Sequence, residues 1–399
     1  MKIGIITFHF PYNCGASLQC YALSKKLEKM GHEVCVIDYC PDYHKNLYKP
    51  LRNPFVAAKR GWKSLGKKAN ILKKIIASAK AFVVALYSWK NYSGMKKADK
   101  IYGEFVKNKL NLTRQYKTLL ELKNNPPVCD LYISGSDQLW NQAITGNSFD
   151  KAYFLKFGDD SVSKITYAVS TRFDEKGKEL EEELKELLNG LDAIAVREAN
   201  DLPIIQKIAN ELNIPVTQTL DPTLLLEEQD YEELLEDAVL EASPYIFTYS
   251  ISSNTQVIVN KITNDLKEKE KLKVVNAVCY PKMVRNATDT TVVGPGQFLW
   301  YIKNAKYVVT DSFHATVFSI LFGKNFINVP RGSKDVRVEQ LLKKLGIDGH
   351  VSKESNGALG QLTNIDYSNV YSNLNDIRKS SVEYLEKRIN LSLESKKEK

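Results

Sequence analysis

The chain has 399 residues, of which 43% are apolar and 26% are charged, a composition that excludes extensive disorder and predicts two or three globular domains. Its net charge of +9 is uneven, because residues 45–100 contain fifteen Lys and Arg and a single acid, Asp99. The N-terminus lacks the features of a signal peptide, and no stretch offers the roughly 20 apolar residues that a bilayer requires.

The first unit reads as strand, helix and strand. Residues 3–8 form a buried type of strand, residues 18–30 follow a helical apolar stripe that ends at Gly31, and 33–38 form a second strand. This order predicts a right-handed crossover and a parallel sheet. Gly15 permits close approach of a ligand to the loop before the helix, although an ordinary strand-to-helix turn explains the same residues. The loop has neither a G-x-G-x-x-G pattern nor a Walker A lysine, so it does not indicate a nucleotide cofactor.

The basic segment 45–100 interrupts this alternation. Between residues 72 and 86, apolar side chains recur at three- and four-residue intervals and lysines lie off that stripe, which predicts an amphipathic helix. One interpretation is a helix that rests on an anionic membrane surface. The other is a helix that packs on the first domain and leaves its lysines in solvent. No nucleic-acid recognition motif accompanies the charge, so we expect no nucleic-acid partner.

Polar residues follow several predicted strands of the first half. The strand 130–135 leads into Ser136 and Asp137, near a tryptophan, Trp140, that could face a sugar ring or lie in the core. A second strand is predicted at 164–170. The strand 193–197 ends at Arg197, whose planar guanidinium suits a carboxylate or a phosphate, or forms an ion pair with Glu198.

A second α/β set begins after an acidic stretch at 227–241, which we expect to cross between domains. Strands are predicted at 245–250, 273–278, 307–310 and 326–329. The predicted organisation is an N-terminal Rossmann-like domain (1–235) with a basic helical insertion (about 45–100), a C-terminal Rossmann-like domain (236–370), and a final helix with a polar tail (371–399). Two such domains facing one another place a ligand cleft at the carboxyl ends of their strands.

The segment 307–323 carries the most specific feature of the second domain. An apolar strand stops at Thr310, and an almost wholly apolar helix follows the polar residues that include Ser312 and His314. A helix of this kind must be buried, so its N-terminus and its free N–H groups face the space above the sheet and favour an anion. His314 in the first turn could donate to an oxyanion or transfer a proton, or it could simply pack in the core.

These motifs together resemble the polysaccharide pyruvyl transferase family. The resemblance runs in order from about residue 3 to 346 and depends on five segments: Asn13-x-Gly15-Ala16-x-Leu18-Gln19, Ser134-Gly-Ser-Asp137-Gln-x-Trp140-Asn141, Val196-Arg197-Glu198, Leu220-Asp221-Pro222-Thr223, and Thr310-Asp311-Ser312-Phe313-His314-Ala315. Arg337 resembles the C-terminal arginine position of the family. Cys14 stands where an aromatic residue is common, and nothing transfers from the family to the basic segment.

The resemblance implies a GT-B-like α/β architecture with two Rossmann-like domains facing a cleft. It also implies transfer of a pyruvyl group from phosphoenolpyruvate to a sugar diol of a surface polysaccharide or of its lipid-linked precursor. On this interpretation His314 and Asp137 are the catalytic residues. The expected substrate-binding residues are Arg197, Ser312, Asn13, Gly15, Ser136 and Arg337.

The scheme requires no cofactor and no metal, with phosphoenolpyruvate as donor substrate and a glycan or lipid-linked saccharide as acceptor. Six scattered cysteines without a C-x-x-C pair are typical of reduced thiols, so we expect a cytoplasmic protein. The membrane interpretation of the basic helix extends this prediction to peripheral attachment at the inner face of the membrane. Two alternatives stay open: a nucleotide-sugar-dependent glycosyltransferase on the same architecture, and a catalytically silent family member that scaffolds a membrane assembly.

Overall fold

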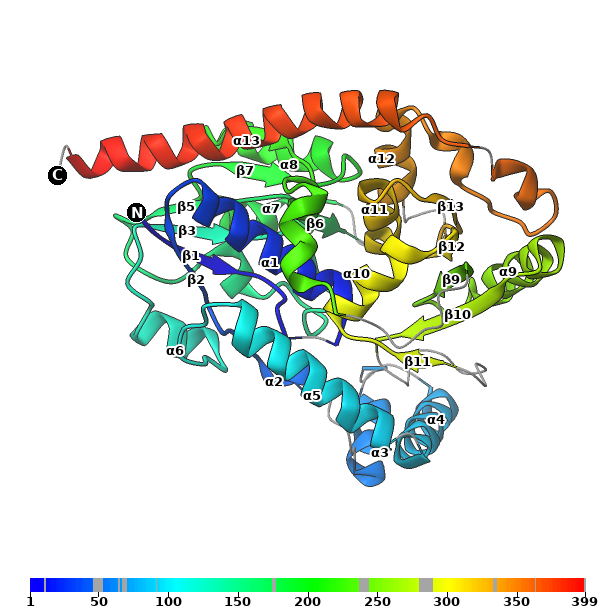
Figure 1. Ribbon diagram of the computed structural model, residues 1–399. Coiled ribbons are helices and arrows are strands. Elements are labelled where there is room, and N and C mark those ends of the chain that lie inside the picture. Colours follow the sequence, from blue (N-terminus) through cyan, green and yellow to red (C-terminus); the bar gives the residue numbers. More distant parts are fainter. Residues whose placement is uncertain are drawn as a thin grey trace.

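The computed structural model describes the chain except residues 11, 46–52, 64, 67–69, 91, 174–176, 237–243, 280–289, 333–335, 363 and 398–399. Parallel sheets lie at the centre, and helices cover their faces (Figure 1).

The strands of the first half form two parallel sheets. In the described chain the first sheet has the order β2-β1-β3-β5 and the second the order β4-β6-β7-β8. A parallel bridge between Ile165 of β5 and Ala193, the residue before β7, connects the two sheets. The strands are β1 (Lys2–Ile6), β2 (Glu33–Val36), β3 (Leu131–Ser134), β4 (Asp137–Asn141), β5 (Ser163–Thr166), β6 (Val169–Arg172), β7 (Ile194–Val196) and β8 (Val216–Gln218).

The single strand predicted at 164–170 is wrong. The structure divides this run into β5 and β6, which pair in different sheets. The break falls at Ala168, which adopts a left-handed φ of 49°. A non-glycine residue takes this conformation only where its surroundings impose it, and no local pattern announces it.

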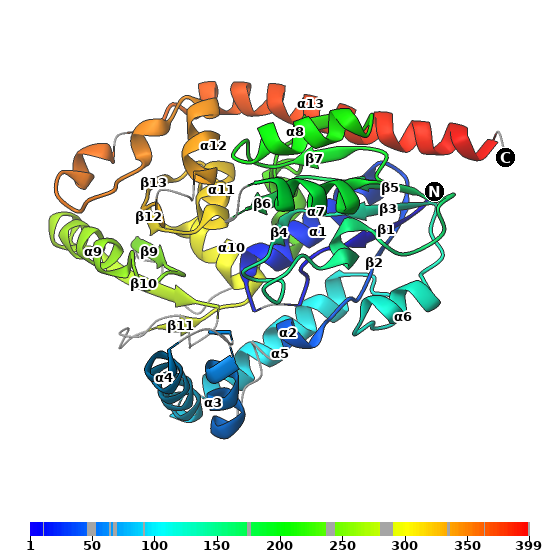
Figure 2. The ribbon, with the colours of Figure 1, turned by 180° about the vertical axis from the view of Figure 1, so that it is seen from behind.

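Helices surround these sheets and join their strands. They are α1 (Cys14–Lys29), α2 (Asp42–Lys45), α3 (Pro54–Lys63), α4 (Ile71–Lys90), α5 (Tyr92–Lys109), α6 (Leu119–Asn124), α7 (Lys178–Leu188) and α8 (Leu202–Glu211). The amphipathic helix predicted between residues 72 and 86 therefore exists, as the longer α4. It pairs with α3 as a hairpin that lies below α5 and apart from the sheets in both views (Figures 1 and 2).

The second half repeats the parallel plan with one sheet. Its order is β11-β10-β9-β12-β13 in the part that the structure describes, with strands β9 (Tyr245–Tyr249), β10 (Lys273–Val278), β11 (Thr291–Val292), β12 (Tyr307–Thr310) and β13 (Asn325–Asn328). The helices are α9 (Gln256–Glu270), α10 (Pro295–Asn304), α11 (Phe313–Leu321), α12 (Arg337–Leu345) and α13 (Tyr367–Lys397). The predicted class, α/β with two Rossmann-like halves, is confirmed.

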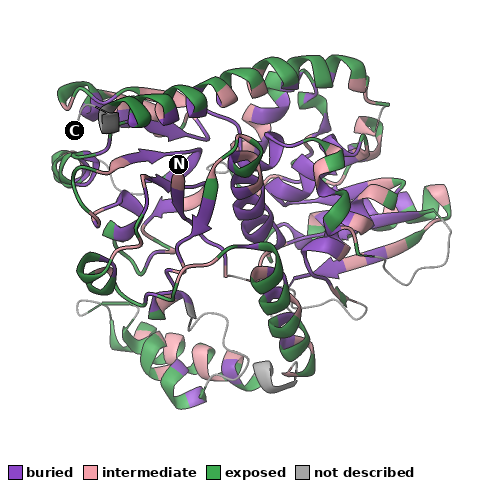
Figure 3. Cartoon of the chain, turned by 60° about the vertical axis from the view of Figure 1, so that its left-hand side comes forward, coloured by how far each residue is buried: buried purple, intermediate pink, exposed green. Residues whose placement is uncertain are grey.

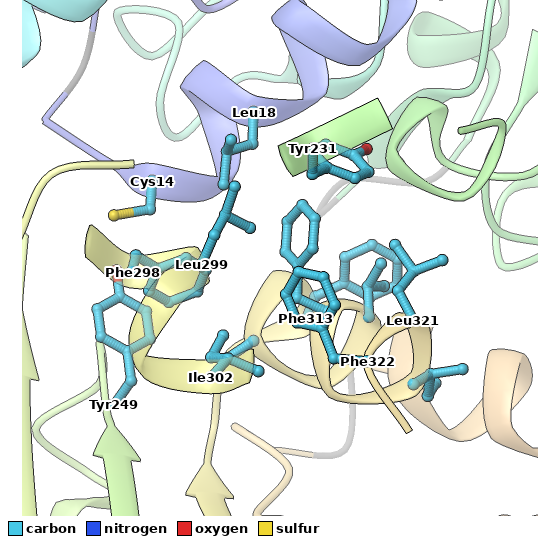
Figure 4. Packing of buried hydrophobic residues seen from close by; sticks show 14 of the residues in the cluster. Cys14, Leu18, Tyr231, Tyr249, Phe298, Leu299, Ile302, Phe313, Leu321 and Phe322 are labelled. Carbon is cyan, nitrogen blue, oxygen red and sulfur yellow. The ribbon is translucent and has the colours of Figure 1, made fainter. Parts of the chain in front are cut away.

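A shared apolar core joins the two halves. Cys14 and Leu18 of α1 lie in one buried cluster with Phe298 and Leu299 of α10 and Phe313 of α11 (Figure 4). The burial pattern shows the same continuity, with buried residues running through the centre of the molecule (Figure 3). Burial of apolar area at this junction holds the N-terminus of α1 against that of α11.

Helix α13 runs along one side of the molecule and crosses both halves (Figures 1 and 2). Near its start Tyr367 donates to the carbonyl of Lys324, and further along Tyr384 donates to the carbonyl of Thr166. Tyr384 belongs to the same buried cluster as Ile3 and Leu131 of the first sheet. The C-terminal helix is therefore part of the N-terminal core.

Among the described residues, no helix is both long enough and apolar enough to cross a membrane.

Candidate active site

The helix start at the end of β12 is built as its sequence predicts. Ser312 is the N-cap of α11, and its hydroxyl accepts from the backbone N–H of Ala315 at 3.4 Å. Asp311 has a different task. Its carboxylate accepts from the backbone N–H groups of Ile251 and Ser252 and from the hydroxyl of Thr255, so it fixes the loop after β9.

His314 lies where two helix N-termini meet. It is the second residue of α11, is only 9% exposed, and packs on Gly15, the second residue of α1. A Cβ atom at position 15 would lie 2.0 Å from Nδ1 of His314, so only glycine fits there. Asn13 caps α1, accepting from the backbone N–H of Gly15 at 2.9 Å. The positive ends of both helix dipoles therefore converge beside the imidazole.

A buried ionic network adjoins this histidine. Asp221 Oδ2 accepts from Arg197 Nη1 at 2.7 Å and from the Ser136 hydroxyl at 2.9 Å, and it lies 3.7 Å from His314 Nε2. Arg197 Nε donates to Glu198 at 3.2 Å. Arg197 and Ser136, which follow separate strands, thus converge with His314 on one carboxylate oxygen of Asp221.

Asp221 and Arg197 both favour their charged forms, and the network is almost wholly shielded from water. Burial raises the pKa of Asp221, but the neighbouring His314 and Arg197 outweigh this and hold the pKa well below its usual range. Burial likewise disfavours the charged form of Arg197, but Glu198, Asp221 and Asp137 hold the pKa of the guanidinium above its usual value. Two buried nitrogen atoms in this group, Arg197 Nη2 and His314 Nε2, have no hydrogen-bond partner among the described residues.

Asp137 and Arg337 come from the two halves of the chain. Asp137 begins β4 with a left-handed φ of 82°, is half-buried, and accepts from the backbone N–H of Gln138. Arg337 begins α12, and its Nη1 lies 2.8 Å from the amide oxygen of Gln138 once that amide is oriented to satisfy both of its groups. The Phe313 ring lies 4.8 Å from the Arg197 guanidinium and 5.9 Å from that of Arg337.

A cleft of about 1150 Å³ opens between the two halves next to this network. Residues at the ends of β6, β7, β9 and β13 line it together with the start of α12, and so the carboxyl ends of parallel strands face it from both sides. Three of its lining residues are arginines, Arg172, Arg331 and Arg337, against two acids, Glu198 and Asp201. The cleft is therefore suited to an anionic ligand.

The structure thus brings all eight predicted site residues into one region. Asn13 and Ser312 serve as helix caps, Gly15 provides space for His314, and Ser136 and Arg197 belong to the buried network. Trp140 does not face the cleft: it is fully buried and stacks on Phe154, so its core interpretation is correct.

Sequence reasoning missed Asp221 as the centre of the network and Arg172 and Arg331 as cleft residues. A signal existed for the arginines, since each stands two residues beyond a predicted strand, and parallel strand ends meet at the cleft. Asp221 follows β8 directly before Pro222, but its partners are distant in sequence and nothing local identifies them. Cys14, where the family pattern has an aromatic residue, points away from the cleft and contacts Cys279 and the Tyr102 hydroxyl.

Within the described residues, no group of three or more His, Cys, Asp or Glu side chains could hold a metal ion.

Comparison with known proteins decides the family. The model of the family described as polysaccharide pyruvyl transferase matches residues 13–333, about four fifths of the chain. The chain belongs to the polysaccharide pyruvyl transferase family. It is accordingly a transferase with a polysaccharide acceptor, and the matched range contains every residue of the buried network. No curated protein matches the sequence significantly.

Solved structures with a similar course of the chain include UDP-N-acetylglucosamine 2-epimerase from Rickettsia bellii, at 10% identity and a TM-score of 0.49, covering 98% of this chain and 96% of that chain. The UDP complex of MnaA from S. aureus is 12% identical, with a TM-score of 0.46 and coverage of 98% of this chain and 97% of that chain. The spinosyn rhamnosyltransferase SpnG is 10% identical, with a TM-score of 0.43 and coverage of 97% and 100%.

Proposed function

We propose that this member of the family transfers the pyruvyl group of phosphoenolpyruvate to two hydroxyl groups of a saccharide, which forms a cyclic ketal and releases phosphate. The observation that supports this most is a pair of buried nitrogen atoms, Arg197 Nη2 and His314 Nε2, that have no hydrogen-bond partner among the described residues and lie where two helix N-termini converge. A donor with both a carboxylate and a phosphate needs several cationic and N–H contacts in one place.

The reaction sets out what the site must do. One acceptor hydroxyl adds to the carbon that carries the phosphate while the neighbouring methylene carbon gains a proton and becomes a methyl group. The second hydroxyl then displaces phosphate from the same carbon, and its proton leaves with the phosphate or with a base. The site must therefore deliver one proton, accept others, and hold a multiply charged anion throughout.

In this scheme His314 delivers the proton to the methylene carbon. The ionised carboxylate of Asp221 lies 3.7 Å from Nε2 of His314. The imidazole ring occupies the space that a side chain at position 15 would fill, and Gly15 leaves that space free. Arg197, fixed by Asp221 and Glu198, presents its remaining nitrogen to the donor carboxylate or phosphate. Arg337 supports the same anion from the other half of the chain.

The cleft supports a saccharide acceptor beside this donor. Its volume of about 1150 Å³ is that of a site for a ligand much larger than a three-carbon phosphate. Gln138 lines the cleft, and its half-buried neighbour Asp137 is our proposed base for an acceptor hydroxyl, while Ser170 and Ser252 add polar groups to the wall.

The test is phosphate release from phosphoenolpyruvate with saccharide diol acceptors. We expect acceptor-dependent release by the wild-type protein and a loss of about 100-fold or more in His314→Ala, the usual scale for a general acid. His32→Ala is the control, since His32 lies in the turn between α1 and β2, at the amino ends of the strands and away from the carboxyl ends that face the site. Full activity of His314→Ala would contradict the role of the histidine.

The donor itself is tested separately. Phosphoenolpyruvate should raise the melting temperature of the wild-type protein, and Arg197→Lys should abolish the shift because a lysine cannot reproduce the forked contacts. Stabilisation by a nucleotide sugar and none by phosphoenolpyruvate would overturn the proposed donor.

A further inference from the structure

The helices α3 and α4 pack closely against one another. Gly61 of α3 lets the two helices approach, since a Cβ there would lie 2.6 Å from the carbonyl oxygen of Ala77 and 3.0 Å from Cβ of Ala81. The rings of Phe55 and Phe82 also meet edge to face, with their centroids 5.6 Å apart. One face of α4 therefore packs on α3.

The other face of α4 is apolar and exposed. Ile71, Leu72, Ile76 and Val83 are each 58–67% exposed. At 3.6 residues per turn the exposed apolar residues of α4 occupy a continuous arc of roughly 140°. Of the sixteen large exposed apolar side chains among the described residues, ten lie between Phe55 and Leu86, so exposure is concentrated on this hairpin rather than scattered.

Positive charge surrounds this arc. Residues 54–90 contain nine Lys and Arg and no Asp or Glu. Lys73 and Lys80 border the arc on α4, and Lys59, Arg60 and Lys63 are exposed on α3. Trp62 is 40% exposed with the ammonium of Lys74 5.9 Å from its ring, the arrangement of an aromatic residue at a membrane interface.

We propose that the α3–α4 hairpin docks this protein on an anionic lipid bilayer, with α4 lying in the plane of the surface. The apolar arc inserts into the boundary between headgroups and acyl chains, and the lysines at its edge contact lipid phosphates. The lysines within α4 give the helix a charged face, which keeps it at the membrane surface. This proposal is independent of the reaction in the cleft, and it accounts for a feature that the cleft does not use.

The charge on the hairpin argues for lipid over a second copy of the chain. Two copies that joined their apolar arcs would bring two basic surfaces close together, and the repulsion between their like charges would oppose association. An anionic bilayer satisfies the apolar arc and the basic border simultaneously.

The experiment is co-sedimentation of the full chain with vesicles. We expect binding to phosphatidylcholine vesicles in which roughly a quarter of the lipid is phosphatidylserine, and binding about tenfold or more weaker without the anionic lipid. Lys73→Glu/Lys80→Glu should lose about tenfold or more in partition to the mixed vesicles. Lys267→Glu/Lys269→Glu, with the same charge change on exposed positions of α9, should bind like the wild type.

The apolar contribution has its own matched pair. Ile76→Ser/Val83→Ser should reduce partition, whereas Leu120→Ser/Val257→Ser, at positions 65% and 76% exposed outside the hairpin, should not. Equal unfolding midpoints for all variants exclude misfolding as the cause of any loss.

Wild-type protein that stays in the supernatant with mixed vesicles would overturn the proposal. So would hairpin variants that sediment like the wild type. A wild-type dimer in light scattering that becomes monomeric in Ile76→Ser/Val83→Ser would replace lipid by a second copy as the occupant.

Discussion

The buried network around Asp221 and the α3–α4 hairpin use charge in opposite ways. In the network every charge has its counter-charge within a few ångströms, and nearly every polar atom is shielded from water. On the hairpin the charges have one sign, and those that the structure describes border apolar side chains that no described residue covers. The first arrangement fixes geometry for chemistry, and the second leaves binding energy available for a partner.

The largest effect that separates the two regions is removal of an arginine. Arg197→Met leaves the carboxylates of Asp221 and Glu198 buried without their cation, and we expect a loss of about 3–5 kcal/mol in the free energy of unfolding. Arg60→Met on the hairpin removes an exposed charge and should change it by less than about 0.5 kcal/mol. Urea unfolding measures both. Equal losses in the free energy of unfolding would mean that Arg197 does not stabilise the buried carboxylates of Asp221 and Glu198.

The next effect concerns glycine. Gly15→Ala would place its Cβ in the His314 ring, so we expect overpacking to lower the free energy of unfolding by about 1–2 kcal/mol. The displaced His314 should also lose most of the transferase activity. Gly103→Ala in α5 meets no atom within 4 Å and should instead stabilise the protein by about 0.5–1 kcal/mol through helix propensity. Opposite signs in thermal unfolding would confirm the close contact. A neutral Gly15→Ala would contradict it.

A smaller effect depends on pH. The folded pKa of Asp221 is depressed, so the unfolded state binds more protons than the folded state as the pH falls below about 4, the pKa of an unperturbed Asp. Its contribution is thus fully present above that pH and is lost progressively below it. Asp221→Asn should lower the slope of stability against pH between pH 5 and pH 3, by about 1 kcal/mol over the interval. The hairpin, with no acid between 54 and 90, contributes nothing to this slope.

The smallest effect is expected on the hairpin itself. Leu72→Ala, at a side chain 61% exposed, should change the free energy of unfolding by less than about 0.5 kcal/mol. The same substitution at Leu18, fully buried in α1, should cost about 2–5 kcal/mol. If both substitutions destabilised the protein alike, the apolar arc would have to be covered by part of the folded chain.

Local patterns were sufficient to predict β12 and the buried helix α11, since strand end, polar turn and apolar run are contiguous in sequence. They were sufficient for α4 as well. The order of the motifs then indicated the family. What the sequence could not reveal is tertiary: the left-handed Ala168, the contact of Gly15 with a histidine 299 residues away, and the use of Asp311 to hold the β9 loop. Each depends on partners brought together by folding.

The path of α13 has a consequence for the order in which the protein is made. Tyr384, Leu385 and Ile389 pack among Ile3 and Leu131 of the first sheet. A ribosome synthesises these residues more than 250 residues after Leu131. Domains usually fold as they are synthesised, N-terminal first. Here part of the apolar surface of the first sheet stays uncovered until α13 has been synthesised.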